Sequence, residues 1–546
     1  MPDVIPFLRI PPFPRSRSTD LARDGAGAGA GFGEEAAGDI VAALRRARVG
    51  GTFWLGDADL PDDRDVLLCA STPQGRQAVL AAAESEGLIG RAAMRGEGRE
   101  DLPSFSAASD PWTLCARARC IIAHADDEWA LVGALAGCDL IIVGKGRYHD
   151  LAQAGGLERA VQAEVLDGWS YVDPFTRQPA SALATIEQLA AWRELIEANR
   201  RFAAIFGVAG WKRVTTDPLL WDGTGPIRHR SSLRPGELAA GDTVLAWIAR
   251  TDEHAVGQLS DLGIAVGEIE DGMIRSSGLG ANCVPPLSIA VDALGPHFDP
   301  SRPSELENIL QNADIDTAMC ARAARLRAEV VQRGIGKYGQ DRNAAPVQPR
   351  ESGRVVLVAG QVEDDRSVLC GGPWLDNFSL LQNARALEPD AWIIFKPHPD
   401  VEAGHRKGHV PDDKVLAFAN AIDRTSSMPA LLARVDAVHV ITSLAGFEAL
   451  LRGCEVVTHG VPFYAGWGLT RDLGPVPERR SRRRSLDEIV AATLILYPRY
   501  LDPVTRLPCS PEMLLSRIDK GEAHIRTPRI LFRELLGRAK LLLGWR

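Results

Sequence analysis

VDAVHVITSLAGFEALLRGCEVVTHGVPFYAGWGL, at Val435–Leu469, is the stretch that decides the fold. Its apolar run Ala437–Ile441 predicts a buried parallel strand, and Thr442–Ser443 is typical of a helix cap. The helix is expected to run to about Leu451, and a second strand is expected at Glu455–His459. The stretch is therefore predicted to be a strand–helix–strand unit of an α/β protein.

The turn at Thr442–Ser443 is predicted to bind a phosphate. Two hydroxyl groups and the N–H groups of the first helical turn face the edge where a parallel sheet opens. The positive end of the helix dipole lies at the same point and attracts anions. We interpret the turn as the anion-binding half of a nucleotide-sugar site.

Composition limits the class of protein. The chain has 546 residues, of which 45% are hydrophobic and 24% charged, enough for three or four domains with cores of their own. A formal net charge of −9 argues against nucleic acid as a general partner. Nine cysteines without a C-x-x-C pair indicate reduced thiols, and we predict no metal site. Because we see no signal peptide and no membrane-spanning run, we expect a cytoplasmic protein.

An internal repeat relates the decisive stretch to the N-terminal region. At an offset of 316 (431 − 115), Cys115–Tyr148 has nearly the same hydrophobic pattern as Leu431–Tyr464. With gaps, SYVDPFTRQPAS at Ser170–Ser181 also matches RYLDPVTRLPCS at Arg499–Ser510. We predict a repeated scaffold. The alternative is that the two segments share only the pattern common to all α/β units.

The polar turn is not repeated. Asp126 and Asp127 stand where the second copy has Thr442 and Ser443, and carboxylates repel a phosphate. We therefore predict that residues 1–200 are a degenerate partial repeat, with a flexible N-terminus, that kept its packing and lost its site.

A second βαβ pattern begins near Trp211, with strands predicted at Thr243–Ala249 and Gly263–Ile269. The second strand ends in Glu270–Asp271, and Gly272 is expected to permit a tight turn. Both carboxylates would then lie at the carboxyl edge of the sheet, where open α/β proteins bind ligands. Taken alone, Asp-Gly after a strand is most often only a turn.

A polar linker with two prolines, Asp341–Gly353, is the predicted domain boundary. We expect an acceptor-side domain at residues 201–345 and a donor-binding domain at 346–520. In the latter, the predicted strand Ala391–Phe395 runs into KPHP, whose prolines fix the backbone around His398. A lone histidine is more often structural, but this one precedes the phosphate-binding turn by one βαβ unit, so we predict a function for it.

These motifs, in this order, resemble those of GT-B glycosyltransferases that use CMP-activated acidic sugars. More closely, Trp211–Ile518 is similar to the bacterial capsule polysaccharide β-Kdo transferases, which are commonly two tandem modules. The motifs that carry the resemblance are EDGMIRSSGLG, GQVEDDRS, KPHPDV, TSLAGFEALLRG, PFYAGWGLT and LYPRYLDPVT. The first 200 residues depart from the family, since they lack both the acidic-Gly motif and the His-Pro.

The resemblance implies an α/β fold of the GT-B type, in which two Rossmann-like domains are preceded by a partial Rossmann-like repeat. It also implies transfer of β-linked Kdo from CMP-Kdo to a glycolipid or lipid-linked sugar, with retention and without a cofactor. Further expected partners are the inner-membrane surface, on which the protein would be peripheral, and other capsule assembly proteins. Two alternatives are a non-catalytic capsule assembly or export factor and a GT-B transferase that uses another nucleotide sugar.

Such chemistry needs few groups, because hydrogen-bond donors and dipoles can stabilise departing CMP without a metal. Asp271, with Glu270 beside it, is the predicted catalytic carboxylate, as nucleophile or as base. Arg275 and Tyr464 are predicted to face the acceptor or the cleft. The residues predicted to bind the CMP-sugar are Gln361, Asp365, Ser367, Lys396, His398, Pro399, Thr442, Ser443 and Glu448, the first three by resemblance.

Three further segments allow competing interpretations. Glu363–Asp365 (EDD) has a rival interpretation as a metal-binding carboxylate cluster for a diphosphate sugar. Arg479–Arg484 (RRSRRR) is either a solvated loop or a functional basic patch. The segment 521–546 is predicted to contain a basic amphipathic helix that lies on an anionic membrane, and the alternative is that it packs back on the domain.

Overall fold

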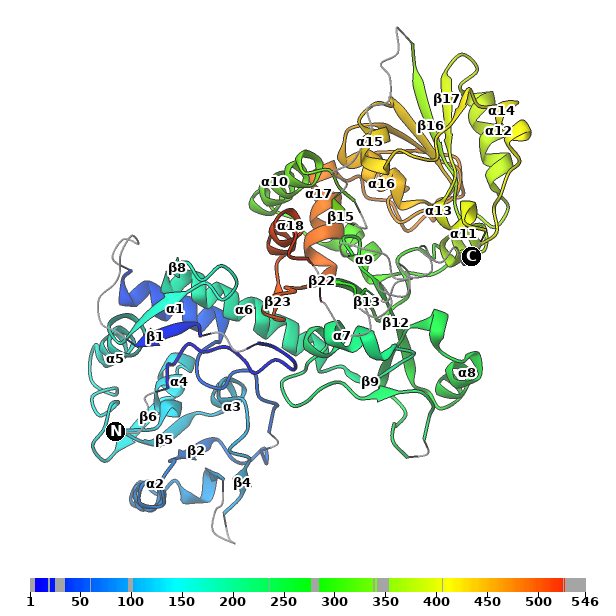
Figure 1. Ribbon diagram of the computed structural model, residues 1–546. Helices are drawn as coiled ribbons and strands as arrows, with labels where there is room; N and C mark the ends of the chain where they lie inside the picture. Colours follow the sequence, from blue (N-terminus) through cyan, green and yellow to red (C-terminus); the bar gives the residue numbers. More distant parts are fainter. Residues whose placement is uncertain are drawn as a thin grey trace, which may run out of the picture. The chain divides into compact units, whose positions relative to one another are not determined.

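A computed structural model describes residues 5–17, 20–24, 35–58, 60–96, 102–234, 236–275, 284–336, 339–340, 353–404, 406–523 and 525. They form two compact units (Figure 1). The first unit takes its residues from 1–201, 217–227 and 505–507, and the second from 202–216, 228–504 and 508–546. The predicted helix in 521–546 lies almost entirely outside the described residues.

The first unit is built around a five-stranded parallel sheet with the order β4-β3-β2-β5-β6. Its strands are β2 (Val66–Cys69), β3 (Ala92–Arg95), β4 (Ser104–Phe105), β5 (Cys120–His124) and β6 (Asp139–Val143). A small antiparallel sheet contains β1 (Ala22–Asp24), β7 (Trp169–Val172) and β8 (Pro179–Ala180). The helices are α1 (Ala37–Ala47), α2 (Pro73–Ser85), α3 (Pro111–Arg117), α4 (Glu128–Ala136), α5 (Gly156–Val161) and α6 (Ala182–Asn199).

The second unit contains two sheets, the first of which has the order β10-β9-β11-β12-β13-β22-β23. It is parallel from β10 to β12 and antiparallel beyond. Its strands are β9 (Phe202–Phe206), β10 (His229–Arg230), β11 (Thr243–Ala246), β12 (Ala265–Asp271), β13 (Ser288–Asp292), β22 (Pro498–Leu501) and β23 (Pro508–Cys509). The helices along this part of the chain are α7 (Arg213–Leu219), α8 (Glu253–Asp261), α9 (Glu305–Asn312) and α10 (Thr317–Gln332).

The second sheet of this unit is parallel throughout, with the order β18-β17-β16-β19-β20-β21. Its strands are β16 (Val355–Ala359), β17 (Trp392–Lys396), β18 (Ala421–Ile422), β19 (Ala437–Val440), β20 (Glu455–Thr458) and β21 (Arg471–Asp472). The helices are α11 (Arg366–Gly371), α12 (Asn377–Leu387), α13 (Pro399–Glu402), α14 (Asp412–Leu416), α15 (Met428–Leu432), α16 (Leu444–Leu451), α17 (Leu486–Val490) and α18 (Pro511–Asp519). A short antiparallel pair, β14 (Ile335–Gly336) and β15 (Gly339–Gln340), completes the unit.

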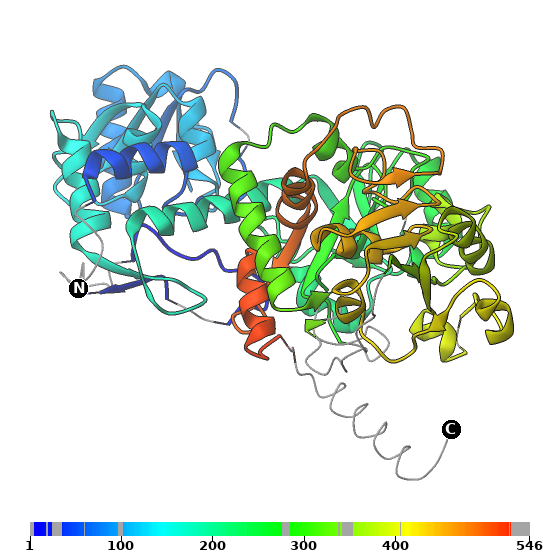
Figure 2. The same ribbon diagram turned by 90° about the horizontal axis from the view of Figure 1, so that it is seen from above.

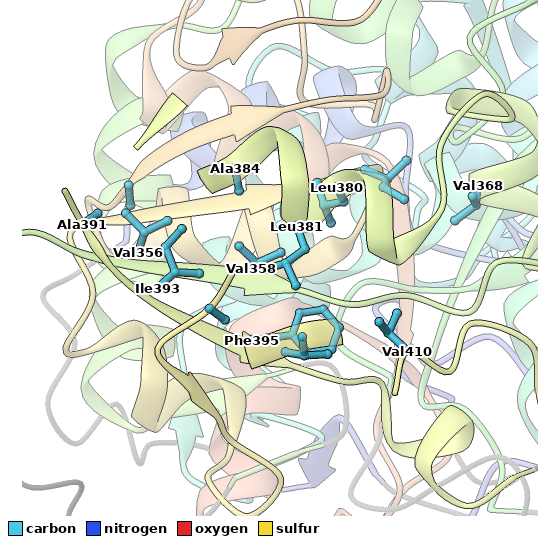
Figure 3. Close-up of a cluster of buried hydrophobic side chains, with 14 residues drawn as sticks. Val356, Val358, Val368, Leu380, Leu381, Ala384, Ala391, Ile393, Phe395 and Val410 are labelled. Atoms are coloured by element: carbon cyan, nitrogen blue, oxygen red, sulfur yellow. The ribbon is translucent and has the colours of Figure 1, made fainter. Parts of the chain in front are cut away.

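The core of the second sheet comes from alternate residues of its strands. Val356 and Val358 of β16 meet Leu380, Leu381 and Ala384 of α12 (Figure 3). All five side chains are fully buried, which removes a large apolar area from water and fixes the helix on the sheet. The sheet edge that carries the predicted site is therefore rigidly supported.

The strand–helix–strand unit predicted for the decisive stretch is confirmed as β19, α16 and β20. The domain boundary at residue 520 differs from the structure, because β22 pairs with β13 of the first sheet, Ser288 opposite Tyr500. The C-terminal helices follow this return, and α17 and α18 pack beside α10 (Figure 2). The chain thus crosses back because β13 would otherwise leave an unpaired strand edge.

The repeat between the N-terminal region and the second sheet of the second unit is also confirmed. At the offset of 316 residues, β5, α4 and β6 correspond to β19, α16 and β20. The order β4-β3-β2-β5-β6 repeats the order β18-β17-β16-β19-β20. Each copy continues with a π-helical turn, Gln162–Asp167 or Ala491–Leu496, and then a β-hairpin. The shared feature is therefore a whole domain and not only a common α/β pattern.

Candidate functional site

Asp271 ends β12 and is held by two cations. Its Oδ1 accepts a hydrogen bond from Lys212 Nζ at 3.2 Å, and its Oδ2 accepts one from Arg275 Nε at 2.6 Å. Lys212 is 6% exposed and Arg275 1% exposed, whereas the Asp271 side chain is 24% exposed. The buried cations stabilise the ionised carboxylate and hold it in one orientation, while part of the Asp271 side chain stays exposed.

Two predictions about this strand end need correction. Arg275 was expected to face the acceptor or the cleft, but its guanidinium is buried and also donates to the carbonyl oxygen of Val284 at 2.9 Å. Gly272 is required for space and not for a positive φ, because a Cβ there would lie 2.2 Å from the Ser288 Oγ of β13. Arg275 is therefore a positioning residue for Asp271.

Glu270 lies beside Asp271 in a different environment. Arg366 Nη1 donates to Glu270 Oε1 at 3.3 Å and to Glu268 Oε2 at 2.8 Å. Burial raises the pKa of Glu270 to about 7, although the guanidinium of Arg366 opposes the shift. Glu270 can therefore exchange a proton near neutral pH, which suits it to act as a general base.

The turn at Thr442 is bound to the loop after β16 through Gln361. Gln361 Oε1 accepts from the Thr442 backbone N–H at 2.8 Å, and Gln361 Nε2 donates to Thr442 Oγ1 at 3.2 Å. Thr442 Oγ1 lies 3.4 Å from Ser367 Oγ. Three predicted donor-binding residues therefore form one hydrogen-bonded chain at the carboxyl edge of neighbouring parallel strands.

Asn377, which sequence reasoning missed, anchors this chain. Its Oδ1 accepts from the Gln361 backbone N–H at 2.8 Å, and its Nδ2 donates to the Gln361 carbonyl at 2.7 Å. The helix α11 then connects the two halves of the site, since Arg366 contacts Glu270 and the next residue, Ser367, contacts Thr442. The acidic strand end and the polar turn are thus linked inside one unit.

Ser443 caps α16, and its Oγ accepts from the backbone N–H of Ala445 at 3.2 Å. Its carbonyl oxygen accepts from the hydroxyl of Tyr464 at 2.5 Å. Tyr464 was expected in the cleft, but its side chain is completely buried. It supports the turn from behind, because its ring packs beneath the first turn of α16 and its hydroxyl fixes the peptide of Ser443.

The KPHP segment ends β17 at the same sheet edge. Lys396 Nζ donates to the carbonyl of Ser426 at 2.5 Å and lies 4.0 Å from Asp423 Oδ1. Burial lowers the pKa of Lys396, and the charge of Asp423 opposes that shift. His398 caps α13, and its Nδ1 accepts from the Asp400 backbone N–H at 3.2 Å. A neutral His398 therefore carries its proton on Nε2.

The remaining predicted donor-binding residues have local structural contacts. Pro399 is the first residue of α13, where proline is favoured. Asp365 caps α11 by accepting from Ser367 N at 3.0 Å and Ser367 Oγ at 2.7 Å. Glu448 of α16 is nearly buried and faces Gly336, where a Cβ would lie 3.1 Å from its Oε1. The role of Glu448 in binding the CMP-sugar stays a prediction.

The carboxylates of Glu363–Asp365 do not converge on one point. Glu363 accepts from the Asn377 backbone N–H at 2.9 Å, Asp364 pairs with Arg406 at 3.1 Å, and Asp365 caps α11. In the described part of the chain, no three His, Cys, Asp or Glu side chains are grouped as metal ligands. The arrangement therefore gives no support to the rival interpretation of this cluster as a metal site.

The corresponding edge of the first unit is occupied by an ion pair. Asp127 caps α4 and accepts from Arg95 Nη1 at 2.9 Å and from Ser71 Oγ at 2.7 Å. Asp127 is 3% exposed, so its charge is neutralised inside the protein. A guanidinium and a carboxylate thus lie where the second unit has the polar turn at Thr442–Ser443.

The basic run Arg479–Arg484 is a solvated loop only in part, because Arg482 and Arg483 are exposed whereas Arg480 and Arg484 are buried. Arg480 donates to Glu307 Oε2 at 2.7 Å and to the carbonyls of Pro462 and Ala465, and Arg484 donates to the carbonyl of Leu310 at 2.6 Å. Both guanidinium groups are buried. They join α9 to the second sheet of the second unit.

Among the described helices, none has the length and apolar character that crossing a bilayer requires.

Residues 320–500 match the model of a family described as capsule polysaccharide biosynthesis protein. The chain is 39% identical over 341 residues to the capsule polysaccharide modification protein LipA of Neisseria meningitidis, covering 61% of this chain and 48% of LipA. It is 44% identical over 243 residues to the lipopolysaccharide-processing protein LpsZ of Rhizobium meliloti, covering 43% of this chain and 54% of LpsZ. The chain thus spans about half the length of these curated relatives.

A solved structure gives the same picture at the level of the fold. KpsC of Thermosulfurimonas dismutans, a β-Kdo 2,4 transferase, is 29% identical, with a TM-score of 0.50 over 58% of this chain and 98% of that one. The two Rossmann-like domains of the second unit agree with the predicted GT-B architecture. Residues 320–500 therefore match the capsule polysaccharide biosynthesis family, and the chain is similar to the β-Kdo transferase KpsC.

Proposed function

We propose that this protein is a glycosyltransferase that transfers Kdo from CMP-Kdo to a glycolipid or lipid-linked sugar acceptor. The observation that carries the proposal is Asp271, an ionised carboxylate held between two buried cations at a sheet edge. That edge is connected through α11 to the polar turn at Thr442. If the ion pairs of Asp271 served only to stabilise the fold, the carboxylate could be fully buried. It is instead partly exposed at the carboxyl edge of the sheet, where open α/β proteins bind ligands.

The geometry supports a double displacement with retention. An Asp271 oxygen would attack the anomeric carbon of the donor, and the bond from that carbon to the CMP phosphate would break with its electron pair leaving on CMP. The N-terminus of α16, Lys396 and His398 would stabilise the departing phosphate. The acceptor hydroxyl would then attack the same carbon, lose its proton to ionised Glu270 and release the Asp271 carboxylate.

The proposal is tested by the product that the protein forms. Incubation with CMP-Kdo and a glycolipid acceptor in the presence of EDTA is expected to give a Kdo-extended glycolipid by mass spectrometry, with a β-linkage by NMR. UDP-sugars should give no product. An inverted linkage would assign Asp271 as a base, whereas a folded protein that extends no acceptor would favour the alternative of a non-catalytic capsule assembly factor.

A further inference from the structure

We propose that Lys212 recognises the carboxylate of the donor's sugar acid and bridges it to Asp271, so that Lys212 makes the site specific for acidic sugars. This inference rests on the function proposed above. It assigns a specificity residue that no motif in the sequence indicates.

Lys212 is held in an aromatic and acidic environment. It ends the 3₁₀ turn Gly210–Lys212, and its Nζ lies 3.0 Å from the ring centroid of Trp247 and 5.3 Å from that of Trp211. The same Nζ donates to Asp271 Oδ1 at 3.2 Å. An ammonium has three donors, and a π-face attracts the charge without using an acceptor lone pair. Lys212 is therefore suited to contact a second carboxylate beside Asp271.

The charge balance around Asp271 favours an incoming anion. Asp271 is contacted by two cations, Lys212 and Arg275. Two other guanidinium groups nearby, those of Arg366 and Arg302, are bound to the carboxylates of Glu268, Glu270 and Asp299. Asp271 carries one negative charge against the two positive charges of Lys212 and Arg275, so its immediate surroundings carry a surplus positive charge.

The chemistry of a sugar acid explains what that charge would do. In a 2-keto sugar acid the anomeric carbon bears a carboxylate, so attack by Asp271 brings two negative charges to within about 4 Å of each other. Like charges at that distance repel strongly in a partly buried site. A cation that contacts both carboxylates removes the repulsion as the new bond forms. An aldose donor has no such carboxylate and would place an uncharged group against a buried ammonium.

A cycle of two enzymes and two donors tests this role. Wild type and Lys212→Met are each assayed with CMP-Kdo and with its C1 carboxamide, which lacks the negative charge. Methionine keeps the length of the side chain and packs favourably on Trp247, so the fold is expected to persist. Lys414→Met, which changes an exposed lysine in α14, is the matched control.

For wild type, we expect the carboxamide to lower kcat/KM by about 100-fold, the scale of one charge-stabilising contact. Lys212→Met should lose about 100-fold with CMP-Kdo but only a few-fold more with the carboxamide. Its affinity for CMP alone, by calorimetry, should match wild type, and Lys414→Met should behave as wild type throughout.

The outcomes separate the inference from the function on which it rests. If wild type transfers Kdo and Lys212→Met discriminates between the two donors as strongly as wild type does, Lys212 does not read the carboxylate and the inference is overturned. If wild type neither binds nor uses CMP-Kdo, the proposed function is wrong and the inference falls with it.

Discussion

Replacement of Asp271 by alanine should affect turnover, stability and nucleotide binding in three different ways. The variant leaves two buried cations without their carboxylate, and breaking a buried pair in this way costs about 3–5 kcal/mol. The variant also lacks the anionic oxygen of Asp271, which is the predicted attacking atom, so turnover should fall by several orders of magnitude. In the proposed site CMP binds to other residues, at the turn of Thr442–Ser443 and at His398, so its affinity should stay within a few-fold of wild type.

The two cations contribute unequally to the loss of stability. Burial lowers the pKa of Lys212 to about 8, and the charge of Asp271 opposes that shift. Without Asp271, the Lys212 ammonium can lose its proton near neutral pH. Removing the proton from a group of pKa about 8 at pH 7 costs about 1.4 kcal/mol, and this is the most that Lys212 can contribute to the loss of stability. Arg275 cannot deprotonate, and at 1% exposure it cannot be hydrated either. Most of the expected loss of about 3–5 kcal/mol therefore comes from Arg275.

Thermal unfolding, calorimetry with CMP and turnover on one preparation would measure all three effects. The double variant Asp271→Ala/Lys212→Met should be more stable than the sum of the single variants predicts, because it removes a cation that the first change left unpaired. The reasoning is refuted if Asp271→Ala unfolds at the wild-type temperature, loses CMP binding while folded, or keeps more than about a tenth of the rate.

Four further changes address other parts of the site. His398→Ala should weaken CMP binding and lower turnover by about 10²–10³-fold, measured by calorimetry and kinetics, because a phosphate contact exists in the ground state and strengthens in the transition state. Glu307→Gln should destabilise the protein by about 3–5 kcal/mol in thermal unfolding, since buried Arg480 loses its carboxylate. Gly446→Ala should destabilise it by about 1–3 kcal/mol in the same assay, because the new Cβ would lie 2.2 Å from the Tyr464 hydroxyl. Turnover should fall as pH drops through about 7 and Glu270 becomes protonated, and Glu270→Gln should abolish that limb of the pH–rate profile.

Matched controls distinguish these effects from general damage. Glu237→Gln removes the carboxylate that pairs with Arg230. Because this carboxylate is more exposed than that of Glu307, stability should change by less than about 1 kcal/mol. Gly257→Ala, in the middle of α8 with no atom within 4 Å of the new Cβ, should be neutral or stabilising by about 1 kcal/mol. Destabilisation by either control as large as in its counterpart would contradict the assigned contacts.

Local patterns in the sequence predicted much of the fold. The strands β12, β16, β17, β19 and β20 each coincide with a short apolar run that has polar residues at its carboxyl end, so their sheet edges could be located from sequence alone. The strand predicted at Thr243–Ala249 is shorter, because β11 ends at Ala246 and a 3₁₀ turn follows at Ile248–Arg250. The repeat could be predicted because its hydrophobic pattern and its YxDPxTRxP motif both survive. The return of β22 to β13 could not, because that pairing joins residues about 200 positions apart and leaves no periodic signal.

The errors at the site concern partners that are distant in sequence. Lys212 precedes Asp271 by 59 residues (271 − 212), and only the fold brings its ammonium to the carboxylate. Arg480 belongs to a run that is typical of solvated surface, but Glu307 supplies a buried partner from another helix. Tyr464 follows a sheet edge, which favoured a cleft position, yet its ring fills the space below α16. The sequence gives no signal for the direction in which the side chain of a charged or aromatic residue points.

The most direct test of the central claim is release of CMP from CMP-Kdo, measured with and without a glycolipid acceptor in EDTA. The account predicts that CMP forms in a one-to-one ratio with Kdo-extended acceptor in wild type, and that Asp271→Ala releases none although it binds CMP. A folded wild-type protein that releases no CMP with any acceptor, or an Asp271→Ala variant that releases CMP at the wild-type rate, would contradict the account.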